Sequence, residues 1–224
     1  DVHELLASCD TLMLDMDGTL LDLAYDNYMW MEHIPAEYAR KHEVSEEHAR
    51  DHLYAAFERI EGKLDWYCLD HWSNELDLDV VALHREQNGR IGFLPGARNF
   101  LQTVADHHVR VLLVTNSHQH TLDIKAEVTD IVDYFDGVHT SHSLGAAKED
   151  QPFWEALKDR ESFDPARTVF IDDNATVLQS ARDFGVEMLL HITRPDTRRE
   201  PRSHDNFVGI EGVGGDGAGF AGRA

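Results

Sequence analysis

The chain of 224 residues contains only two cysteines, Cys9 and Cys68. Small secreted domains held together by disulfides carry many more, so this fold must depend on a hydrophobic core. Apolar residues make up 42% of the sequence, which is enough for such a core. We expect both cysteines to be reduced residues of the interior rather than metal ligands or nucleophiles.

Long hydrophobic runs are also missing. The longest apolar run surrounds residues 111–114, whereas a membrane-spanning helix needs about 18 consecutive apolar residues or more. The first residues show no basic region followed by an apolar stretch, the pattern of a signal peptide. These absences favour a cytoplasmic protein that does not interact with membranes.

Positive charge is scarce. The sequence has 20 Lys and Arg against 42 Asp and Glu, which gives a net charge of −22, and only five of the basic residues are lysines. Such a chain repels anionic lipid and the phosphate backbone, so we exclude polymeric nucleic acid as a partner. The same acidity is compatible with adaptation to high salt or with an ordinary acidic surface.

Strand and helix patterns alternate in most of the chain. Apolar runs at 11–14, 109–115 and 168–171 predict buried strands, and 187–192 predicts a weaker one. Helical spacing occurs at 99–107, 152–158 and 175–184. This alternation is typical of a doubly wound (Rossmann-like) α/β domain with a parallel sheet.

Residues 23–90 follow a different pattern. Helical spacing over 27–42, 45–62, 65–76 and 80–87 is not interrupted by any strand-like run, and 89–96 has the composition of a linker. We therefore predict an α/β core at 1–22 and 91–203 with an inserted all-helical domain at 23–90. Seven glycines between 209 and 222 predict a flexible tail over 204–224.

Two carboxylates follow the first predicted strand. Asp15 and Asp17 are separated by one residue, and Gly18 allows a sharp backbone turn directly after them. Ligands of open α/β sheets bind at the carboxyl ends of the strands, and paired carboxylates there can hold Mg²⁺. The alternative for this segment alone is an acidic turn with a capping role only.

Further polar residues follow the other strands. Thr115 and Asn116 end the second run, Lys148 precedes a helix, and Asp172 and Asp173 end the third run. Each alone could be a helix cap or a surface charge. A parallel sheet would bring them to one edge, and this convergence is more specific than any one of them.

In their order along the chain, these motifs resemble those of the haloacid dehalogenase-like (HAD) superfamily of phosphohydrolases: DxDGT at 15–19, then Thr115, Lys148, and the pair Asp172 and Asp173. The helical insertion resembles the superfamily's small cap. The resemblance implies that Asp15 is a nucleophile forming an aspartyl-phosphate and that Asp17 is the general acid and base. It implies Mg²⁺ bound by Asp15, Asp17 (through its backbone carbonyl), Asp172 and, less directly, Asp173, with Thr115, Asn116 and Lys148 binding the phosphoryl group.

The helical insertion carries aromatic segments at 23–30 and 64–72. Together with 115–120 and 148–151, they resemble the bacterial GMP/IMP nucleotidase subgroup, which implies a purine nucleoside monophosphate as substrate. Trp66, Tyr67 and His118 are candidate substrate contacts, although aromatics at helical spacing usually pack in a core. A sugar-phosphate or phosphoglycolate phosphatase, a phosphoglucomutase-like isomerase and a non-catalytic binding module remain alternatives.

Histidine, in contrast, is abundant, with 15 residues. His118 and His120, and His139 and His142, have close spacings that could suggest a zinc site. However, neither pair is accompanied by a local set of cysteines or glutamates that would complete a zinc site. We therefore predict no zinc site and expect most of these histidines at the surface.

Overall fold

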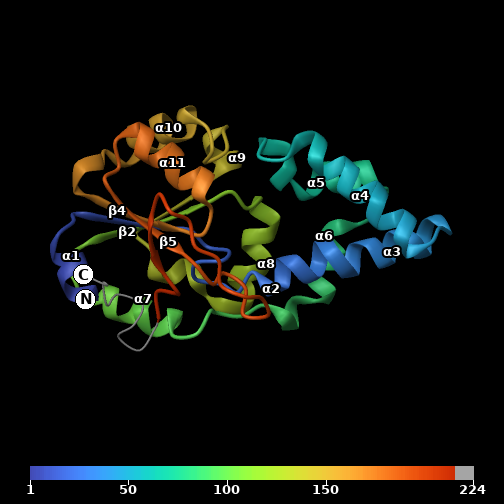
Figure 1. The fold of residues 1–224 in the computed structure, drawn as a ribbon, viewed down its shortest axis with the longest axis horizontal. Coiled ribbons are helices and arrows are strands. Elements are labelled where there is room, and N and C mark those ends of the chain that lie inside the picture. Colours follow the sequence, from blue (N-terminus) through green and yellow to red (C-terminus); the bar gives the residue numbers. More distant parts are fainter. Residues whose placement is uncertain (215–224) are drawn as a thin grey trace.

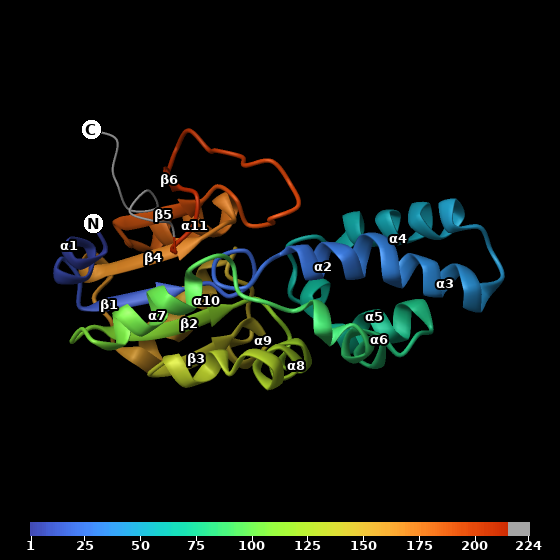
Figure 2. The same ribbon diagram turned by 90° about the horizontal axis from the view of Figure 1, so that it is seen from below.

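The computed structural model describes residues 1–214. Its centre is a six-stranded sheet in which all neighbouring strands are parallel, in the order β3-β2-β1-β4-β5-β6 (Figures 1 and 2). This confirms the predicted doubly wound α/β class. The strands are β1 (Thr11–Leu14), β2 (Arg110–Thr115), β3 (Gly137–Thr140), β4 (Thr168–Asp172), β5 (Met188–Ile192) and β6 (Val208–Ile210).

The register of the sheet places the functional motifs together. Leu14, near the end of β1, is aligned with Leu113 of β2 and Ile171 of β4. Because all three strands run in the same direction, the residues that follow them emerge at one edge of the sheet. The chemistry-bearing segments after β1, β2 and β4 therefore meet, although those after β1 and β4 are more than 150 residues apart in the sequence.

Helices cover both faces of the sheet, because successive residues of a buried strand point to opposite sides. Met13 packs with the buried residues of α10 and α11, whereas Leu12 and Leu14 pack with those of α7 and α8. In Figure 1, α10 and α11 lie above the strands and α7 lies below them. The helices of this domain are α1 (Val2–Ala7), α7 (Ala97–Ala105), α8 (Gln119–Thr129), α9 (Ser141–Leu144), α10 (Gln151–Glu161) and α11 (Ala175–Phe184), with 3₁₀ turns at Ile131–Tyr134 and Pro165–Arg167.

Residues 24–90 form a separate helical lobe, which we call the cap. It extends from the carboxyl edge of the sheet (Figure 2), and its elements are all helical. They are α2 (Ala24–Tyr28), a π-helical turn at Met29–His33, α3 (Ile34–His42), α4 (Glu46–Ile60), a 3₁₀ turn at Leu64–Tyr67, α5 (Leu69–Leu76), α6 (Val80–Glu86) and a 3₁₀ turn at Asn88–Arg90.

The first cap helix differs from the single helix predicted at 27–42. A π-helical turn, Met29–His33, separates α2 from α3. Pro35 follows it and has no N–H to donate to the carbonyl of Met31, so the regular α-helical pattern is interrupted at this point. Such turns are frequent at functional sites, and this one carries Trp30 and Met31.

The prediction of a flexible tail over 204–224 was wrong for its first part. Val208–Ile210 forms β6, which pairs with β5, and both Ile210 and Val213 are buried in the core. Gly96 also lies against Gly214, because a Cβ atom on Gly96 would overlap the Gly214 carbonyl oxygen. Glycine therefore serves close packing here, and the remaining residues, 215–224, lie outside the described part.

Among residues 1–214, no helix combines the length and the apolarity of a bilayer span.

Candidate active site

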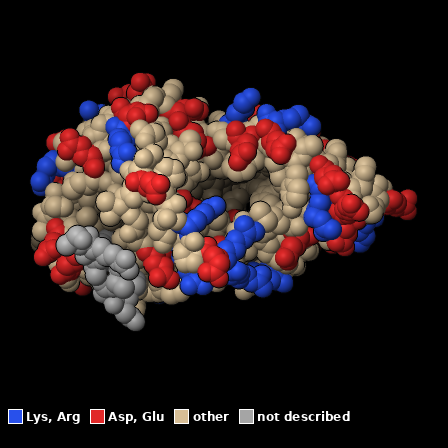
Figure 3. All heavy atoms as spheres, viewed as in Figure 1, with Lys and Arg blue, Asp and Glu red and all other residues tan. Residues whose placement is uncertain are grey.

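A cavity of about 620 Å³ lies between the carboxyl edge of the sheet and the cap. Figure 3 shows the molecule hollowed between its two lobes, with basic side chains beside the opening. The volume is within the range of small-molecule sites. Every predicted site residue except His118 lines this cavity: Asp15, Asp17, Trp66, Tyr67, Thr115, Asn116, Lys148, Asp172 and Asp173.

Lys148 connects two of the strand ends. Its ammonium group donates to Asp15 Oδ1 at 2.9 Å, to Asp172 Oδ2 at 2.7 Å and to the Val114 carbonyl at 3.0 Å. All three donor positions are thus used, and the side chain is fully buried. Burial alone would lower the pKa of Lys148, but the charges of Asp15 and Asp172 outweigh it and raise the pKa. Lys148 therefore remains positively charged beside the nucleophile candidate.

Three carboxylates surround this one lysine, so two negative charges are not balanced by it. Oxygen atoms of Asp15, Asp172 and Asp173 lie within 4.8 Å of one another. Burial, followed by the charge of Asp172, raises the pKa of Asp15 to about 7, and burial and Asp15 raise that of Asp173. A bound cation would favour the charged form of both carboxylates, which burial and their mutual repulsion disfavour. An all-oxygen donor set with uncompensated charge fits Mg²⁺.

Gly18 fits the backbone turn that follows Asp17. Its φ is +85°, a conformation that other residues rarely adopt. A Cβ atom at this position would also lie 2.7 Å from Cγ of Asp173 and 2.9 Å from Cβ of Pro195. Any side chain here would therefore displace Asp173, so the glycine of the DxDGT motif is required both by conformation and by space.

Asp17 is held by two residues that the sequence analysis did not select. Lys125 donates to Asp17 Oδ1 at 2.5 Å, and Ser117 donates its hydroxyl to Asp17 Oδ2 at 2.6 Å. Lys125 also donates to Asp26 of the cap at 2.7 Å and is 1% exposed. A signal exists only once α8 is recognised as a helix, because Lys125 then shares a face with Leu122 and Thr129, which the structure shows to be buried. A lysine on such a face needs an acidic partner.

Asn116 positions other residues of the site. Its Oδ1 accepts from the backbone N–H of Lys148 at 2.8 Å, and its Nδ2 donates to Glu149 Oε1 at 2.6 Å. Asn116 therefore links the segments that carry Lys148 and Glu149. Thr115 Oγ1 accepts from the backbone N–H of Ser117, so its hydroxyl proton is free to be donated into the cavity.

The cap side of the cavity is aromatic. Trp30, Phe57 and Trp72 pack edge to face, with ring centroids 4.8 to 6.0 Å apart. Trp72 is 1% exposed and donates its indole N–H to the Trp66 carbonyl, so its role is structural. Trp66 and Tyr67 are only half-buried, and Tyr67 donates its hydroxyl to Glu149 at 2.7 Å. This bond joins the cap to the core directly beside Lys148.

His118 and Cys68 depart from the sequence predictions. His118 does not line the cavity and lies instead beside His142 and Cys68. Cys9 is buried as predicted, whereas Cys68 is half-buried at the start of α5. The reason is the docking of the cap on the core, which places Cys68 at the junction of the two lobes rather than in the interior of either.

Comparison with known proteins agrees with this geometry. The family of haloacid dehalogenase-like hydrolases matches residues 9–185. The chain is 37% identical to the GMP/IMP nucleotidase YrfG of Escherichia coli over 188 residues, which cover 84% of this chain and 85% of the relative.

Solved structures share the fold at low sequence identity. An HAD phosphatase from Thermococcus onnurineus superposes with a TM-score of 0.76 at 21% identity, covering 91% of this chain and 94% of that one. L-2-haloacid dehalogenase from Xanthobacter autotrophicus gives a TM-score of 0.57 at 12% identity, covering 92% and 96%. The fold alone thus accommodates different reactions. On the family match and the 37% identity, the chain belongs to the haloacid dehalogenase-like hydrolase family and is an enzyme of the phosphatase type.

Proposed function

We propose that the protein is a Mg²⁺-dependent 5′-nucleotidase that hydrolyses purine nucleoside monophosphates such as GMP and IMP through an aspartyl-phosphate. The observation that carries the proposal is the convergence of Asp15, Asp17 and Lys148 on one cavity whose other wall is aromatic. A hydrolase acting on haloacids would not need the second carboxylate, so the presence of Asp17 favours phosphate esters.

In the proposed mechanism, Asp15 attacks phosphorus and the ester oxygen leaves, which gives a phosphorylated Asp15. Asp17 protonates the leaving oxygen and then takes a proton from the water that hydrolyses the intermediate. Lys125 and Ser117 hold the Asp17 carboxylate in position for both transfers. Lys148 and the Thr115 hydroxyl bind phosphoryl oxygens, where the lysine offsets part of the developing negative charge.

The metal ligands in this proposal are Asp15, Asp172, Asp173 and the backbone carbonyl of Asp17. Bound Mg²⁺ supplies the positive charge that lets an anionic phosphate approach a site with several carboxylates. The donors are held in place by the protein itself, since Asp172 Oδ1 accepts from the Asn174 N–H at 2.8 Å. Lys148 fixes the second oxygen of Asp172.

The choice of a purine nucleotide is supported by the cap side of the cavity and by the 37% identical nucleotidase. Trp66 and Tyr67 offer aromatic faces, and stacking of a base on such a face is worth roughly 1–3 kcal/mol. Arg199 and Arg202, from the segment between β5 and β6, also line the cavity and add positive charge near its opening.

A phosphate-release assay tests the proposal. We expect release of inorganic phosphate from GMP and IMP that depends on Mg²⁺ and exceeds release from pyrimidine nucleotides, sugar phosphates and phosphoglycolate. Efficient release without purine preference would reject the nucleotide assignment and leave the chemical step intact. Conversion of a sugar phosphate to its isomer without phosphate release would point to the isomerase alternative.

A further inference from the structure

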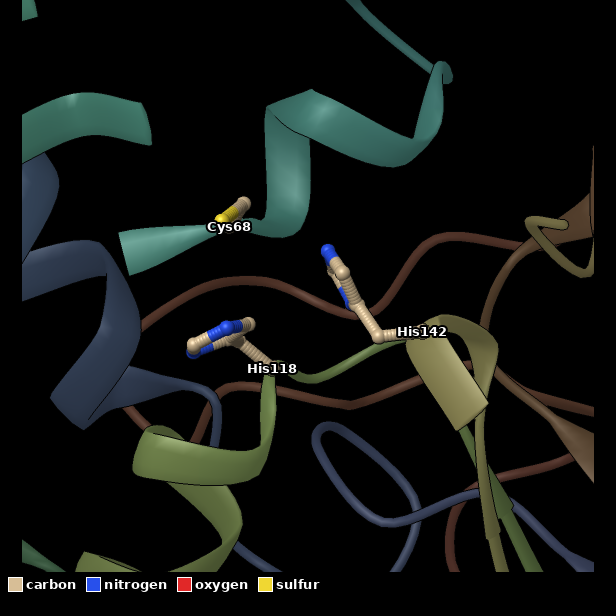
Figure 4. Close-up of side chains that lie close together, drawn as sticks. All are labelled: Cys68, His118 and His142. Carbon is tan, nitrogen blue, oxygen red and sulfur yellow. The ribbon is translucent and has the colours of Figure 1, made fainter. Parts of the chain in front are cut away.

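Three side chains from distant parts of the sequence meet at the junction of cap and core. Cys68 begins α5 of the cap, His118 precedes α8, and His142 lies in α9. One candidate ligand atom from each lies within 4.8 Å of the other two, and all three residues are half-buried. Figure 4 shows the thiol and the two imidazole rings around one common space.

This donor set differs from that of the catalytic cavity. A thiolate and two imidazoles are the ligands of Zn²⁺ and related borderline metals, whereas the all-oxygen set of Asp15, Asp172 and Asp173 suits Mg²⁺. None of Cys68, His118 and His142 lines the catalytic cavity. The two donor sets would therefore bind different metals at separate places.

The spacing permits coordination after a small adjustment. With zinc–sulfur and zinc–nitrogen bonds of about 2.3 and 2.0–2.1 Å, tetrahedral ligands lie roughly 3.3–3.6 Å apart. The present separations of up to 4.8 Å would have to shorten by about 1.5 Å at most. Rotation of half-buried side chains can supply this movement without a change in the backbone.

An unsatisfied nitrogen provides a second, independent indication of a ligand. Among the described residues, the buried Nε2 of His142 has no hydrogen-bond partner. A buried polar atom in this state is costly and calls for an explanation, of which a bound ion is one. The other ring nitrogen of His142 has only a long contact, 3.5 Å, to the Ser141 hydroxyl.

The local electrostatics suit metal binding. Burial and then the proximity of His142 lower the pKa of His118, and burial lowers that of His142, so both rings are neutral ligands near pH 7. Cys68 is the N-cap residue of α5, and its sulfur accepts from the backbone N–H of His71 at 3.4 Å.

We propose that Cys68, His118 and His142 form a second metal site, which binds Zn²⁺ or a similar borderline divalent cation with water as the fourth ligand. Because Cys68 belongs to the cap and both histidines to the core, the metal would join the two lobes in the closed arrangement seen here. This site does not depend on the proposed nucleotidase function.

A neighbouring group shares one of these ligands. Atoms of Asp70, His118 and His120 also lie within 4.8 Å of one another, with Asp70 and His120 exposed. Exposed acidic groups are often close to histidines without binding a metal, so we favour the more buried cysteine-containing set. The two sets are distinguished by whether sulfur coordinates the metal.

The test is titration of the protein with Co²⁺ at saturating Mg²⁺, followed by absorption spectroscopy. We expect one equivalent to produce a thiolate-to-cobalt charge-transfer band together with the intense visible bands of four-coordinate cobalt, and Zn²⁺ to displace it. Cys68→Ser should abolish the charge-transfer band and lower the Zn²⁺ affinity by at least about a hundredfold, since loss of an outer-shell partner alone costs about 10–100-fold.

The matched controls are Cys9→Ser, at the other free thiol, and His120→Gln, at the neighbouring group. Both should keep the band, whereas His142→Gln should lose affinity as Cys68→Ser does. A measurement on the unaltered chain does not depend on whether the variants fold: Zn²⁺ should protect Cys68 from alkylation. Cobalt spectra without a thiolate band, or alkylation of Cys68 at the same rate with and without Zn²⁺, would overturn the proposal.

Discussion

The core side and the cap side of the cavity are built in different ways. On the core side, Asp15, Lys148 and Asp172 are fully buried, and each is fixed by hydrogen bonds to residues that follow neighbouring strands. On the cap side, Trp66 and Tyr67 are half-buried on a short 3₁₀ turn, and much of their surface is apolar. The rigid, charged side suits the chemical step, and the aromatic side suits recognition of the rest of the substrate.

The two sides are joined by polar contacts. Lys125 bridges Asp17 of the core and Asp26 of the cap, much as Lys148 bridges two aspartates within the core. Tyr67 adds a hydrogen bond to Glu149. Substitutions on the core side should therefore lower turnover, those on the cap side should change substrate affinity, and those at the junction should affect both.

The largest effect is expected for Asp15→Asn, because an amide cannot attack phosphorus. Removal of a nucleophile typically lowers kcat by roughly 10⁴-fold or more. The control is Asp10→Asn, the same chemical change at an exposed residue whose side chain pairs with Arg167, and surface pairs contribute about 0–1 kcal/mol. Phosphate release measured for both variants checks this, and residual activity of Asp15→Asn near that of the control would remove Asp15 from the mechanism.

Lys125→Met should affect both sides at once. It leaves Asp17 and Asp26 without their common cation, and breaking a buried ion pair costs about 3–5 kcal/mol. Turnover should also fall by roughly a hundredfold, since Asp17 loses its orientation. Urea unfolding and kcat are the measurements, with the exposed Lys158→Met as the control.

A double variant separates the two effects of Lys125. Burial, opposed by Lys125, raises the pKa of Asp26 to about 7, so Asp26→Asn removes a carboxylate that the lysine otherwise balances. Lys125→Met combined with Asp26→Asn should regain part of the lost stability but not the lost turnover. Full recovery of turnover would mean that Lys125 acts only on the attachment of the cap.

The core side was predictable from sequence because its motifs follow continuous apolar strands. Runs such as Thr168–Asp172 are recognisable, and a parallel sheet brings their carboxyl ends together whatever the length of chain between them. The two missed strands are short: β3 has glycine or polar residues at most positions, and β6 has three residues with a glycine in the middle. They lie at the two edges of the sheet and are only partly buried, so their sequences need fewer apolar residues.

The junction of cap and core was not predictable in the same way. The contacts of Lys125 with Asp26 and of His118 with Cys68 form only when the helical lobe docks against the sheet edge. No spacing along the chain encodes that docking. Residues 119–129 carried only a weak helical pattern, so the helix that presents Lys125 was not identified and the lysine had no assigned face.

His84 should make the stability of the cap side sensitive to acid. It is 1% exposed, and burial lowers its pKa to about 4 from an ordinary value of 6.5. Between these values the unfolded state binds a proton that the folded state does not, so stability decreases as the pH falls through this window. The loss should approach about 3 kcal/mol near pH 4.

Unfolding by urea at several pH values measures this loss. His84→Gln should show a flatter dependence of the unfolding free energy on pH than the unaltered protein between pH 6.5 and 4. The control is His108→Gln, the same change at an exposed histidine. Equal slopes for all three proteins would show that acid sensitivity arises elsewhere.

The smallest effect is expected for Tyr67→Phe, which removes a single hydroxyl from the contact between the two sides. Its hydrogen bond to Glu149 should contribute about 1 kcal/mol, and Glu149 keeps its bond from Asn116. Because Lys148 and the carboxylates are unchanged, we expect KM to rise roughly fivefold with kcat nearly constant. Tyr38→Phe, on a side chain that does not line the cavity, should leave both unchanged. If kcat fell and KM stayed constant, Tyr67 would act on the chemical step through Glu149 and Asn116. A cap residue would then determine turnover, contrary to the assignment of turnover to the core side and affinity to the cap side.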